Sequence, residues 1–564
     1  MNRIEEEKPE KKGRGEQMSL RARWVGPVPE ETERVARAAF PKGNIYMRMR
    51  DELGTIYVDE QFEGLFPERG QPGESPWRLA LITVMQFAEG LTDRQAADAV
   101  RGRLDWKYAL GLELTDAGFD FSVLSEFRSR LVEGQAEQVL LDSMLSQFKA
   151  RGLLKARGKQ RTDSTHIVAA IGTLNRVELV AETLRHALES LAVVVPEWLK
   201  AQVGSEWFER YGERMRDYRL PKEEPERQAM AETIGRDGVQ LLSAIYDDST
   251  PDWLRRIPAV DVLRQVWVQQ YYQQEGHVHW RLSGNLPPSG CMIPSPYDTQ
   301  ARYSTKRETS WVGYKAHLTE TCDEDSPNLI THVDTTLATD SDISVMDCLY
   351  RDLAHKALLP AEHLVDTAYV GSDWLVTSST DYGVDLLGPV HPDTTWQAQA
   401  AQGFDIAHFT IDWSQHCATC PMDKTSTQWT PHRGRNGNPV IKIQFSPSVC
   451  LSCSARPLCT RSKTGGRNLS VLPENQHLAL QAARQHQQTQ DFKDRYALRA
   501  GVEGTISQSA FALQSRRARY RGLAKVHLQN IATSAAINLT RIVAWLFGSP
   551  RSCTCQSHFA ALAV

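Results

Sequence analysis

The chain has 564 residues, with 65 basic and 69 acidic side chains and a formal net charge of −4. At about 100–200 residues per domain, this length predicts roughly three to four modules. An apolar fraction of 41% excludes a wholly disordered chain. There is no uncharged apolar run of about 18 residues, which argues against a membrane span, and the charged N-terminus lacks the apolar segment of a secretion signal. We therefore expect a soluble intracellular protein, in which any basic surface for nucleic acid is local.

Residues 1–39 are predicted to be a disordered charged lead, and residues 40–150 a domain of short helices. Apolar side chains at helical spacing indicate its core. They are Leu79, Ile82, Val84, Phe87, Leu124, Phe127 and Leu131. Short helices joined by tight turns are compatible with a DNA-binding helix-turn-helix, and equally with a structural or dimerising bundle. Acidic and basic residues are interspersed here, so the charge does not decide between the two.

Residues 151–403 show the pattern of a mixed α/β domain. β-branched and apolar runs predict strands over 161–172, 311–320, 328–336 and 362–370. A helical pattern follows the first strand over 173–192, and another lies near 344–358. The polar segment near 197–290 is expected to be a helical insertion.

Beyond residue 403 the composition changes twice. Residues 404–472 are rich in Cys, Pro and Gly, and residues 473–548 are predicted to be helical. One face of the last helix carries Ile531, Ala535, Leu539 and Ile542. Residues 549–564 are expected to form a flexible tail.

Two acidic residues at strand ends are the first candidates for catalysis. Asp163 lies directly before a β-branched run, and Asp366 follows Leu364 and Val365. In α/β sheets, chemistry gathers where strands end and loops begin. Clustered carboxylates repel one another unless cations neutralise them, and their oxygens suit Mg²⁺ or Mn²⁺. Two such ions about 3.5–4 Å apart activate a nucleophile and stabilise the leaving oxygen in phosphodiester displacement.

A third acidic residue belongs to a helical pattern. Tyr496, Arg499 and Glu503 are spaced by three and then four residues, which places them on one face of a helix. A carboxylate for metal, a guanidinium for phosphate and a phenol for packing or hydrogen bonding then share that face. Taken alone, the spacing also describes an ordinary intrahelical Arg–Glu pair.

Three further acids compete for the metal role. Asp334, Asp340 and Asp342 follow a predicted strand. A loop with helix-capping aspartates explains them more simply.

Five cysteines lie between residues 417 and 459. Cys417 and Cys420 form one CxxC pair, Cys450 and Cys453 form a second, and Cys459 follows. Two CxxC pairs are typical of a closed, structural Zn²⁺ site with a small β-hairpin between them. Cys459 either replaces one of the four ligands or is free. Cys291, Cys322 and Cys348 are interpreted as isolated buried thiols.

A basic run follows the third acid. Residues 516–525 contain Arg516, Arg517, Arg519, Arg521 and Lys525 and no acidic residue. These side chains can neutralise phosphates, and Tyr520 can stack on an exposed base. The alternative is a solvated helix end. Contacts with phosphates fix register without reading sequence, so recognition would come from the N-terminal helices or the Cys-rich segment.

Several of these motifs together resemble those of DDE insertion-sequence transposases. Asp163 in QRTDSTHIVAAI, Asp366 in HLVDTAYVG and Glu503 in YALRAGVEGTISQS are similar to the acidic triad of these enzymes. The Tyr-x2-Arg-x3-Glu spacing matches a signature around the last acid in one large group. Residues 295–321 look like the block before the second acid, and residues 69–111 like the shared N-terminal domain.

The resemblance implies an RNase H-like mixed-sheet catalytic core with an all-α N-terminal domain and a small Cys-rich insertion. It implies a DNA transposase that cuts the ends of its element and joins them to target DNA, with two Mg²⁺ (or Mn²⁺) ions held by Asp163, Asp366 and Glu503. Tyr496 and Arg499 would contact DNA, and Arg499 would steady a phosphate. The partners implied are double-stranded DNA and, in the active complex, at least a second copy of the chain. The expected location is the bacterial cytoplasm, on the nucleoid when DNA is bound.

The sequence departs from the pattern at one position. A basic residue often stands seven positions after the Glu, where this chain has Ala510. Arg517, fourteen positions after Glu503, would face the same way on an unbroken helix and is a candidate substitute. Two alternative functions stay open. One is a catalytically silent DNA-binding protein derived from such an element, and the other is a nuclease that cuts without joining.

Overall fold

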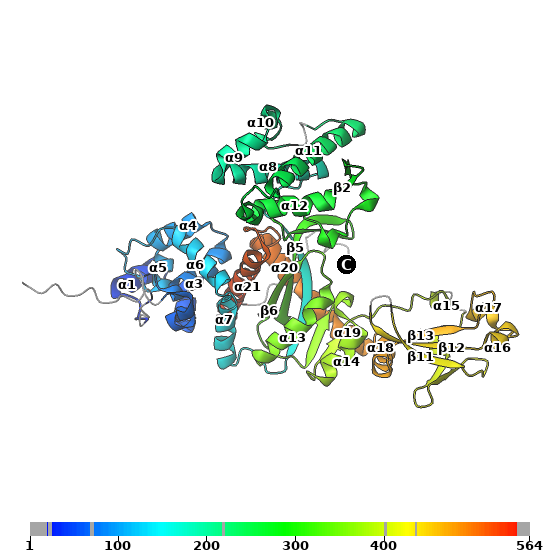
Figure 1. The fold of residues 1–564 in the computed structure, drawn as a ribbon. Helices are drawn as coiled ribbons and strands as arrows, with labels where there is room; N and C mark the ends of the chain where they lie inside the picture. The colour runs from blue at the N-terminus through cyan, green and yellow to red at the C-terminus, as the bar shows by residue number, and fades with distance from the viewer. Residues whose placement is uncertain are drawn as a thin grey trace, which may run out of the picture.

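The computed structural model describes residue 20 and residues 25–67, 73–216, 220–399, 403–434 and 437–549. A central sheet is surrounded by three further regions (Figure 1). The N-terminal helices lie on one side of it, a helical insertion lies beyond one end, and the Cys-rich region lies on the side away from the N-terminal helices. None of the described helices is both long enough and apolar enough to cross a membrane.

The N-terminal region is helical, as predicted. Its helices are α1 (Glu30–Ala39), α2 (Ile45–Leu53), α3 (Pro76–Glu89), α4 (Asp93–Gly102), α5 (Leu104–Leu110), α6 (Ser122–Glu133) and α7 (Val139–Ala150). The prediction of a disordered lead over 1–39 is wrong for the residues of α1. Three acids in its first turn and Arg37 in its last complement the helix dipole, so the charges that suggested disorder favour a helix. Residues 1–19 and 21–24 lie outside the described residues.

The central sheet has six strands. They are β1 (Lys159–Val168), β4 (Arg302–Lys306), β5 (Thr309–Thr321), β6 (Ile330–Leu337), β7 (Glu362–Val365) and β8 (Asp385–Leu387). Across the sheet the order is β6-β5-β1-β7-β8, with β4 paired to the first residues of β5. The pairs β6–β5 and β5–β1 are antiparallel, whereas β1–β7 and β7–β8 are parallel. This mixed arrangement is that of an RNase H-like core, and it confirms the predicted fold class.

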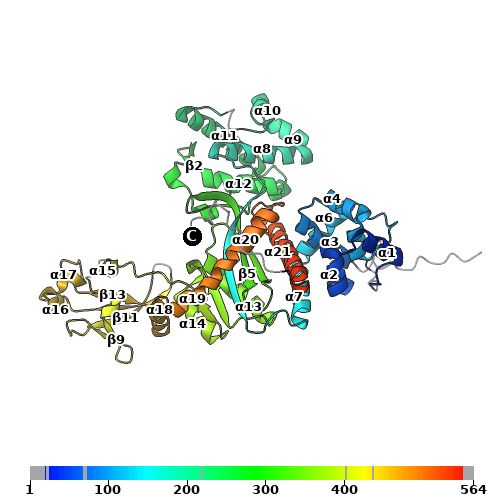
Figure 2. The ribbon, with the colours of Figure 1, turned by 180° about the vertical axis from the view of Figure 1, so that it is seen from behind.

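Helices cover both faces of this sheet. On one face lie α19 (Gln490–Ala497), α20 (Gly501–Ala512) and α21 (Leu523–Leu546), as Figure 2 shows. On the other lie α13 (Met346–His355) and α14 (Ser372–Thr380), and α18 (Glu474–His486) packs beside α14. The side-chain amide of Asn538 on α21 donates to the carbonyl of Ile330 and accepts from its N–H, each at 2.8 Å. These bonds fix α21 against the edge strand β6.

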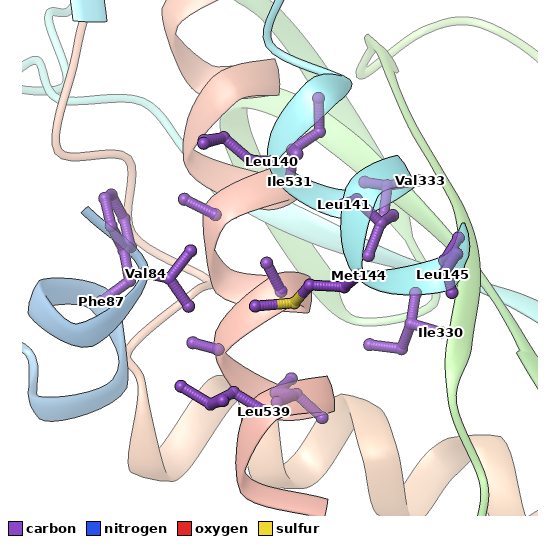
Figure 3. Close-up of a cluster of buried hydrophobic side chains, with 14 of the residues drawn as sticks. Val84, Phe87, Leu140, Leu141, Met144, Leu145, Ile330, Val333, Ile531 and Leu539 are labelled. Carbon is purple, nitrogen blue, oxygen red and sulfur yellow. The ribbon is translucent and has the colours of Figure 1, made fainter. Parts of the chain in front are cut away.

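One hydrophobic core joins the N-terminal helices to the sheet. Figure 3 shows Val84 and Phe87 of α3, Met144 of α7 and Val333 of β6 arranged around α21. The predicted core residues of the N-terminal domain and of the last helix are all buried. Helix α21 therefore packs against the sheet on one side and against the N-terminal helices on the other.

The insertion has a hydrophobic core of its own. It consists of α8 (Arg176–Val194), α9 (Pro196–Gln202), α10 (Ser205–Tyr211), α11 (Glu224–Ile245), α12 (Pro258–Gln270) and the hairpin β2 (Tyr271–Gln274) and β3 (His277–Trp280). Asn175 and Glu178 form a capping box that starts α8. The sequence suggested that the insertion begins near residue 197, but α8 packs within it.

The Cys-rich region is a small β-structure with short helices. Its strands are β9 (Thr410–Asp412), β10 (Cys417–Thr419), β11 (Gln428–Arg433), β12 (Pro439–Gln444) and β13 (Asn468–Val471), and its helices are α15 (Trp396–Gln399), α16 (Pro447–Leu451) and α17 (Arg456–Cys459). The antiparallel pair β11–β12 lies between the two CxxC pairs, which confirms the predicted hairpin. Residues 550–564, which include most of the predicted tail, lie outside the described residues.

Candidate active site

Two of the three candidate acids lie side by side on the sheet. Strands β1 and β7 run parallel, with Thr162 opposite Val365. Asp163 and Asp366 are the next residues along each strand, so they share one face of the sheet and one end of this strand pair. The N–H groups of Ser164 and Thr367 donate to the two carboxylates at 2.7 and 2.6 Å. These short bonds orient both side chains.

Arg499 connects the third acid to this pair. It lies in the 3₁₀ turn Leu498–Ala500, directly before α20, and Glu503 lies in the first turn of that helix. Arg499 Nη2 is 2.5 Å from Asp163 Oδ2, and its Nη1 donates to Glu503 Oε1 at 3.1 Å. The Glu503 side chain is 65% exposed, whereas those of Asp163 and Arg499 are largely buried. The structure therefore brings Asp163, Arg499 and Glu503 together.

The charges at this site influence one another. Burial raises the pKa of Asp163, an effect that Asp366 reinforces and that Arg499 and the Ser164 N–H oppose. Burial acts to lower the pKa of Arg499, but Asp163 and the other carboxylates outweigh it and raise the value. The Nε of Arg499 is buried and has no hydrogen-bond partner among the residues the structure describes. One N–H donor of Arg499 is therefore buried without a partner among the described residues.

Tyr496 lies on the same helical face but packs against protein. Its ring stacks on Phe492 at 5.3 Å between centroids. Both rings contact the cluster of Leu364, Leu387 and Cys322 on the sheet. The tyrosine therefore anchors the helix that leads into Arg499.

A buried ion cluster that the sequence analysis missed lies behind the acids. Glu320 of β5 is fully buried and accepts from Arg161 Nε at 2.7 Å, from Arg541 Nη1 at 2.7 Å and from the Thr505 hydroxyl at 2.6 Å. Arg161 Nη1 also donates to the carbonyl of Leu498 at 2.6 Å. These bonds join β1, β5, α20 and α21 directly beneath Arg499 and Glu503. We call Glu320, Arg161 and Arg541 the buried ion cluster.

A glycine allows the helix to approach this cluster. A Cβ built on Gly501 would overlap the guanidinium of Arg161. The only sequence signal for the cluster was the presence of charged residues inside predicted buried strands.

The competing acids lie elsewhere. Asp342 pairs with Lys315 Nζ at 2.8 Å and accepts from Ser164 Oγ at 3.0 Å. Ser164 neighbours Asp163 on β1, so its side chain points to the opposite face of the sheet. The helix-capping interpretation is wrong for Asp342, whose carboxylate pairs with the lysine, and for Asp334, which lies within β6. The Asp340 carboxylate accepts from the N–H of Leu337 in its own loop.

Four of the five clustered cysteines line one pocket. Cys420, Cys450, Cys453 and Cys459 line it, whereas Cys417 is not among its lining residues. Burial raises the pKa of Cys459, Arg467 lowers it, and the three neighbouring thiols raise it further. Of the three cysteines expected to be buried and isolated, Cys322 is buried, whereas Cys291 and Cys348 are exposed. That prediction is wrong for these two.

The basic run is divided between two environments. Helix α20 ends at Ala512, and Arg517 pairs with Val168 at the end of β1. Arg517 is therefore not on the helical face of Glu503, because the helix is broken between them. Arg519 donates to the carbonyl of Leu91 at 3.0 Å and lies over Phe87.

Tyr520 also faces the N-terminal helices, where the guanidinium of Arg128 lies 5.4 Å from its ring. Its ring packs against the hydrophobic core that joins the N-terminal helices to the sheet. It is therefore not placed to stack on a base. Of the remaining basic residues, Arg517, Arg521 and Lys525 are exposed, and Arg516 Nε donates to the hydroxyl of Thr165 at 3.1 Å.

The described donor side chains do not converge on a metal site in this structure. Among the described residues, no group of three or more His, Cys, Asp or Glu side chains is arranged so that it could hold a metal ion. The three carboxylates are chemically suited to Mg²⁺, but here Arg499 lies between Asp163 and Glu503. The thiols that line the Cys-rich pocket are chemically suited to Zn²⁺.

Two segments of the chain match families of known proteins. Residues 34–130 match a family model described as a transposase domain (DUF772), and residues 419–543 match one described as a transposase DDE domain. The second segment contains Glu503, whereas Asp163 and Asp366 lie outside both. No curated protein and no solved structure matches the chain.

Proposed function

The chain carries two transposase domains, which support an insertion-sequence transposase of the DDE class, and on this premise we propose that it cuts DNA strands at the ends of its element and joins them to target DNA. The observation that carries the proposal is the arrangement of Asp163, Asp366, Arg499 and Glu503 on one face of an RNase H-like sheet. Hard oxygen ligands and a guanidinium are the groups that phosphoryl transfer requires.

The acids would hold two Mg²⁺ or Mn²⁺ ions. These ions would activate water, and later a 3′-hydroxyl, for in-line attack on phosphorus and would stabilise the leaving oxygen. Asp163 and Asp366 are well suited to hold a cation in place, because each is oriented by a backbone N–H. Glu503 is exposed and stands on a helix that the buried ion cluster fixes to the sheet.

Arg499 would take two roles in turn. Before DNA binds, its guanidinium neutralises Asp163 and Glu503. When DNA binds, the guanidinium would donate to a phosphate oxygen in place of the exposed Glu503 carboxylate, and charge-assisted bonds of this kind are about twice as strong as neutral ones. Arg499 would thereby orient the scissile phosphate over the acids.

The Cys-rich region would hold a structural Zn²⁺. We propose Cys420, Cys450, Cys453 and Cys459 as the ligands, because these four line one pocket. A site closed by four thiolates leaves no position for chemistry. Its role would be to stabilise a small β-structure whose apolar core is limited.

A cleavage and joining assay tests the function. Purified protein is incubated with labelled DNA that carries the sequences flanking its own gene, with Mg²⁺ or with EDTA. We expect metal-dependent joined products, and we expect Asp163→Asn and Asp366→Asn to abolish them while DNA binding stays largely intact. A mutant with full cleavage would remove that residue from the site.

The other two functions predict different products. Specific binding without cleavage under all metals tried would indicate a silent DNA-binding protein. Cleavage without joined products would indicate a nuclease.

A further inference from the structure

A pocket rich in arginine lies at the far end of the strand that carries Asp163. Its volume is about 690 Å³. The backbone that follows β1 forms one wall, the insertion supplies Arg185 and Arg214, and the basic run supplies Arg517 and Arg521. Tyr297 completes the lining. We call this cavity the arginine pocket.

Two of the four guanidiniums are held in place by protein. Arg185 donates to the buried carboxylate of Glu182 at 3.2 Å and to the hydroxyl of Tyr297 at 2.6 Å. Arg214 Nε is 3.6 Å from the same carboxylate. The ring of Tyr297 lies 5.6 Å from the guanidinium carbon of Arg521 and 5.9 Å from that of Arg214. The tyrosine therefore stands between three cations.

The other two guanidiniums have no acidic partner among the described residues. Arg517 and Arg521 are exposed, and neither forms an ion pair with any residue that the structure describes. Glu182 is the carboxylate that Arg185 and Arg214 share, and Arg185 also reaches the exposed Glu189. The pocket therefore has an excess of positive charge in a concave site, which is the environment that attracts a polyanion.

Arg499 and Arg516 lie along β1 between the candidate acids and the arginine pocket. Arg499 contacts Asp163, and Arg516 Nε donates to the hydroxyl of Thr165, two residues further along β1, at 3.1 Å. The N–H of Val168 then donates to the carbonyl of Arg516, and the N–H of Ala518 to that of Val168. Five residues of strand span about 17 Å, the axial rise of about five base pairs.

We propose that the arginine pocket binds backbone phosphates of the DNA strand about five nucleotides from the phosphate at Asp163, Asp366 and Glu503. The proposal rests on the proposed function for the position of that phosphate. Several guanidiniums around one cavity match phosphate oxygens, which accept paired hydrogen bonds from arginine. The pocket would hold the strand without reading its sequence, because it offers cations for the backbone.

Binding in EDTA tests the pocket apart from catalysis. The affinity of Arg517→Gln/Arg521→Gln for a duplex is measured between 50 and 200 mM salt, beside wild type and the matched control Arg236→Gln/Arg264→Gln. Each lost phosphate contact lowers the slope of log K against log salt by about 0.9. We therefore expect the pocket variant to lose roughly tenfold less affinity than wild type over this range, for flanking and random sequences alike, and the control to match wild type.

A second measurement locates the contact. Neutral methylphosphonates are placed singly along each strand, and their effect on binding is compared between wild type and the pocket variant. We expect the substitutions four to six nucleotides from the cleavage position to weaken binding to wild type and not to the variant. If the variant does not fold, the single substitution Arg521→Gln replaces it and is expected to lower the slope by about 0.9, the value for one phosphate contact.

Three results would overturn the proposal. The first is a salt slope of the pocket variant equal to that of the wild type. The second is a methylphosphonate profile that the variant leaves unchanged. The third is thermal stabilisation of wild type alone by inorganic pyrophosphate with DNA binding unaffected, which would assign the pocket to a small phosphate. If wild type shows the expected slopes but no cleavage, the proposed function is contradicted, whereas phosphate binding by the arginine pocket is not.

Discussion

Replacing Glu320 with glutamine should lower the free energy of unfolding of the catalytic core. The expected effect is on the fold and not on the reacting groups. The carboxylate is fully buried and accepts one hydrogen bond each from Arg161, Arg541 and Thr505, and Arg161 Nη2 makes a further ion-pair contact with it at 2.6 Å. An amide keeps one oxygen, so its NH₂ group must face N–H donors from one of the two arginines. About two charge-assisted bonds are lost, at about 1.5–3 kcal/mol each. Removing one partner of a buried ion pair costs about 3–5 kcal/mol by independent reasoning.

The assay is thermal unfolding of Glu320→Gln beside wild type. A loss of about 4 kcal/mol corresponds to a fall in Tm of roughly 8–16 °C for a cooperative unit of about 200 residues. The matched control is Glu503→Gln, the same change at a side chain that is 65% exposed. We expect this control to unfold within about 0.5 kcal/mol of wild type and to lose cleavage. A Tm of Glu320→Gln within 2 °C of wild type would refute the reasoning, because the cluster would then contribute nothing to the fold.

Three further predictions concern the helix, a buried histidine and the thiols. Gly501→Ala should reduce cleavage at least tenfold, because its methyl group would overlap a buried guanidinium, whereas Gly504→Ala meets open space and should raise Tm slightly; equal activity of the two variants would contradict this. Burial lowers the pKa of His363 to about 3, so the unfolded chain binds a proton below about pH 6.5 that the folded chain does not, and stability should fall by about 2 kcal/mol from this group at pH 5. His363→Gln should flatten that slope in urea unfolding between pH 5 and 7.5, and an unchanged slope would exclude the histidine as its cause. Cys459→Ser should lower the zinc content measured by mass spectrometry, whereas Cys417→Ser should not. The opposite result would make Cys417 a zinc ligand in place of Cys459.

The sheet and its acids were accessible from the sequence because they follow local patterns. A β-branched run directly after Asp163 and a strand that ends just before Asp366 mark the two acids, and the period of an α-helix places Arg499 beside Glu503. The predicted strand-end position is wrong for Asp163, which lies within β1. The apolar face of the last helix was likewise visible, since burial of apolar residues repeats every three to four positions.

The parts that the sequence did not predict depend on contacts between distant residues. The buried ion cluster joins positions 161, 320 and 541, and no periodicity marks a charge that is buried by its partners. Helix α8 was assigned to the core because it follows β1, yet its apolar face packs within the insertion. Arg517 was placed on the helix of Glu503 because fourteen residues are close to four turns, and the break after Ala512 changes its position.

The position of α21 has a consequence for shortened copies of this gene. The insertion and the Cys-rich region each have a core of their own, so a deletion of either leaves the remaining apolar surfaces covered. The N-terminal helices share their core with the sheet through α21. A gene that starts translation downstream of residue 150 would therefore produce a catalytic fragment with α21 uncovered, and such a fragment would aggregate or be degraded. Deletions from the 5′ end of the gene should therefore prevent folding of the protein more readily than deletion of the insertion or of the Cys-rich region.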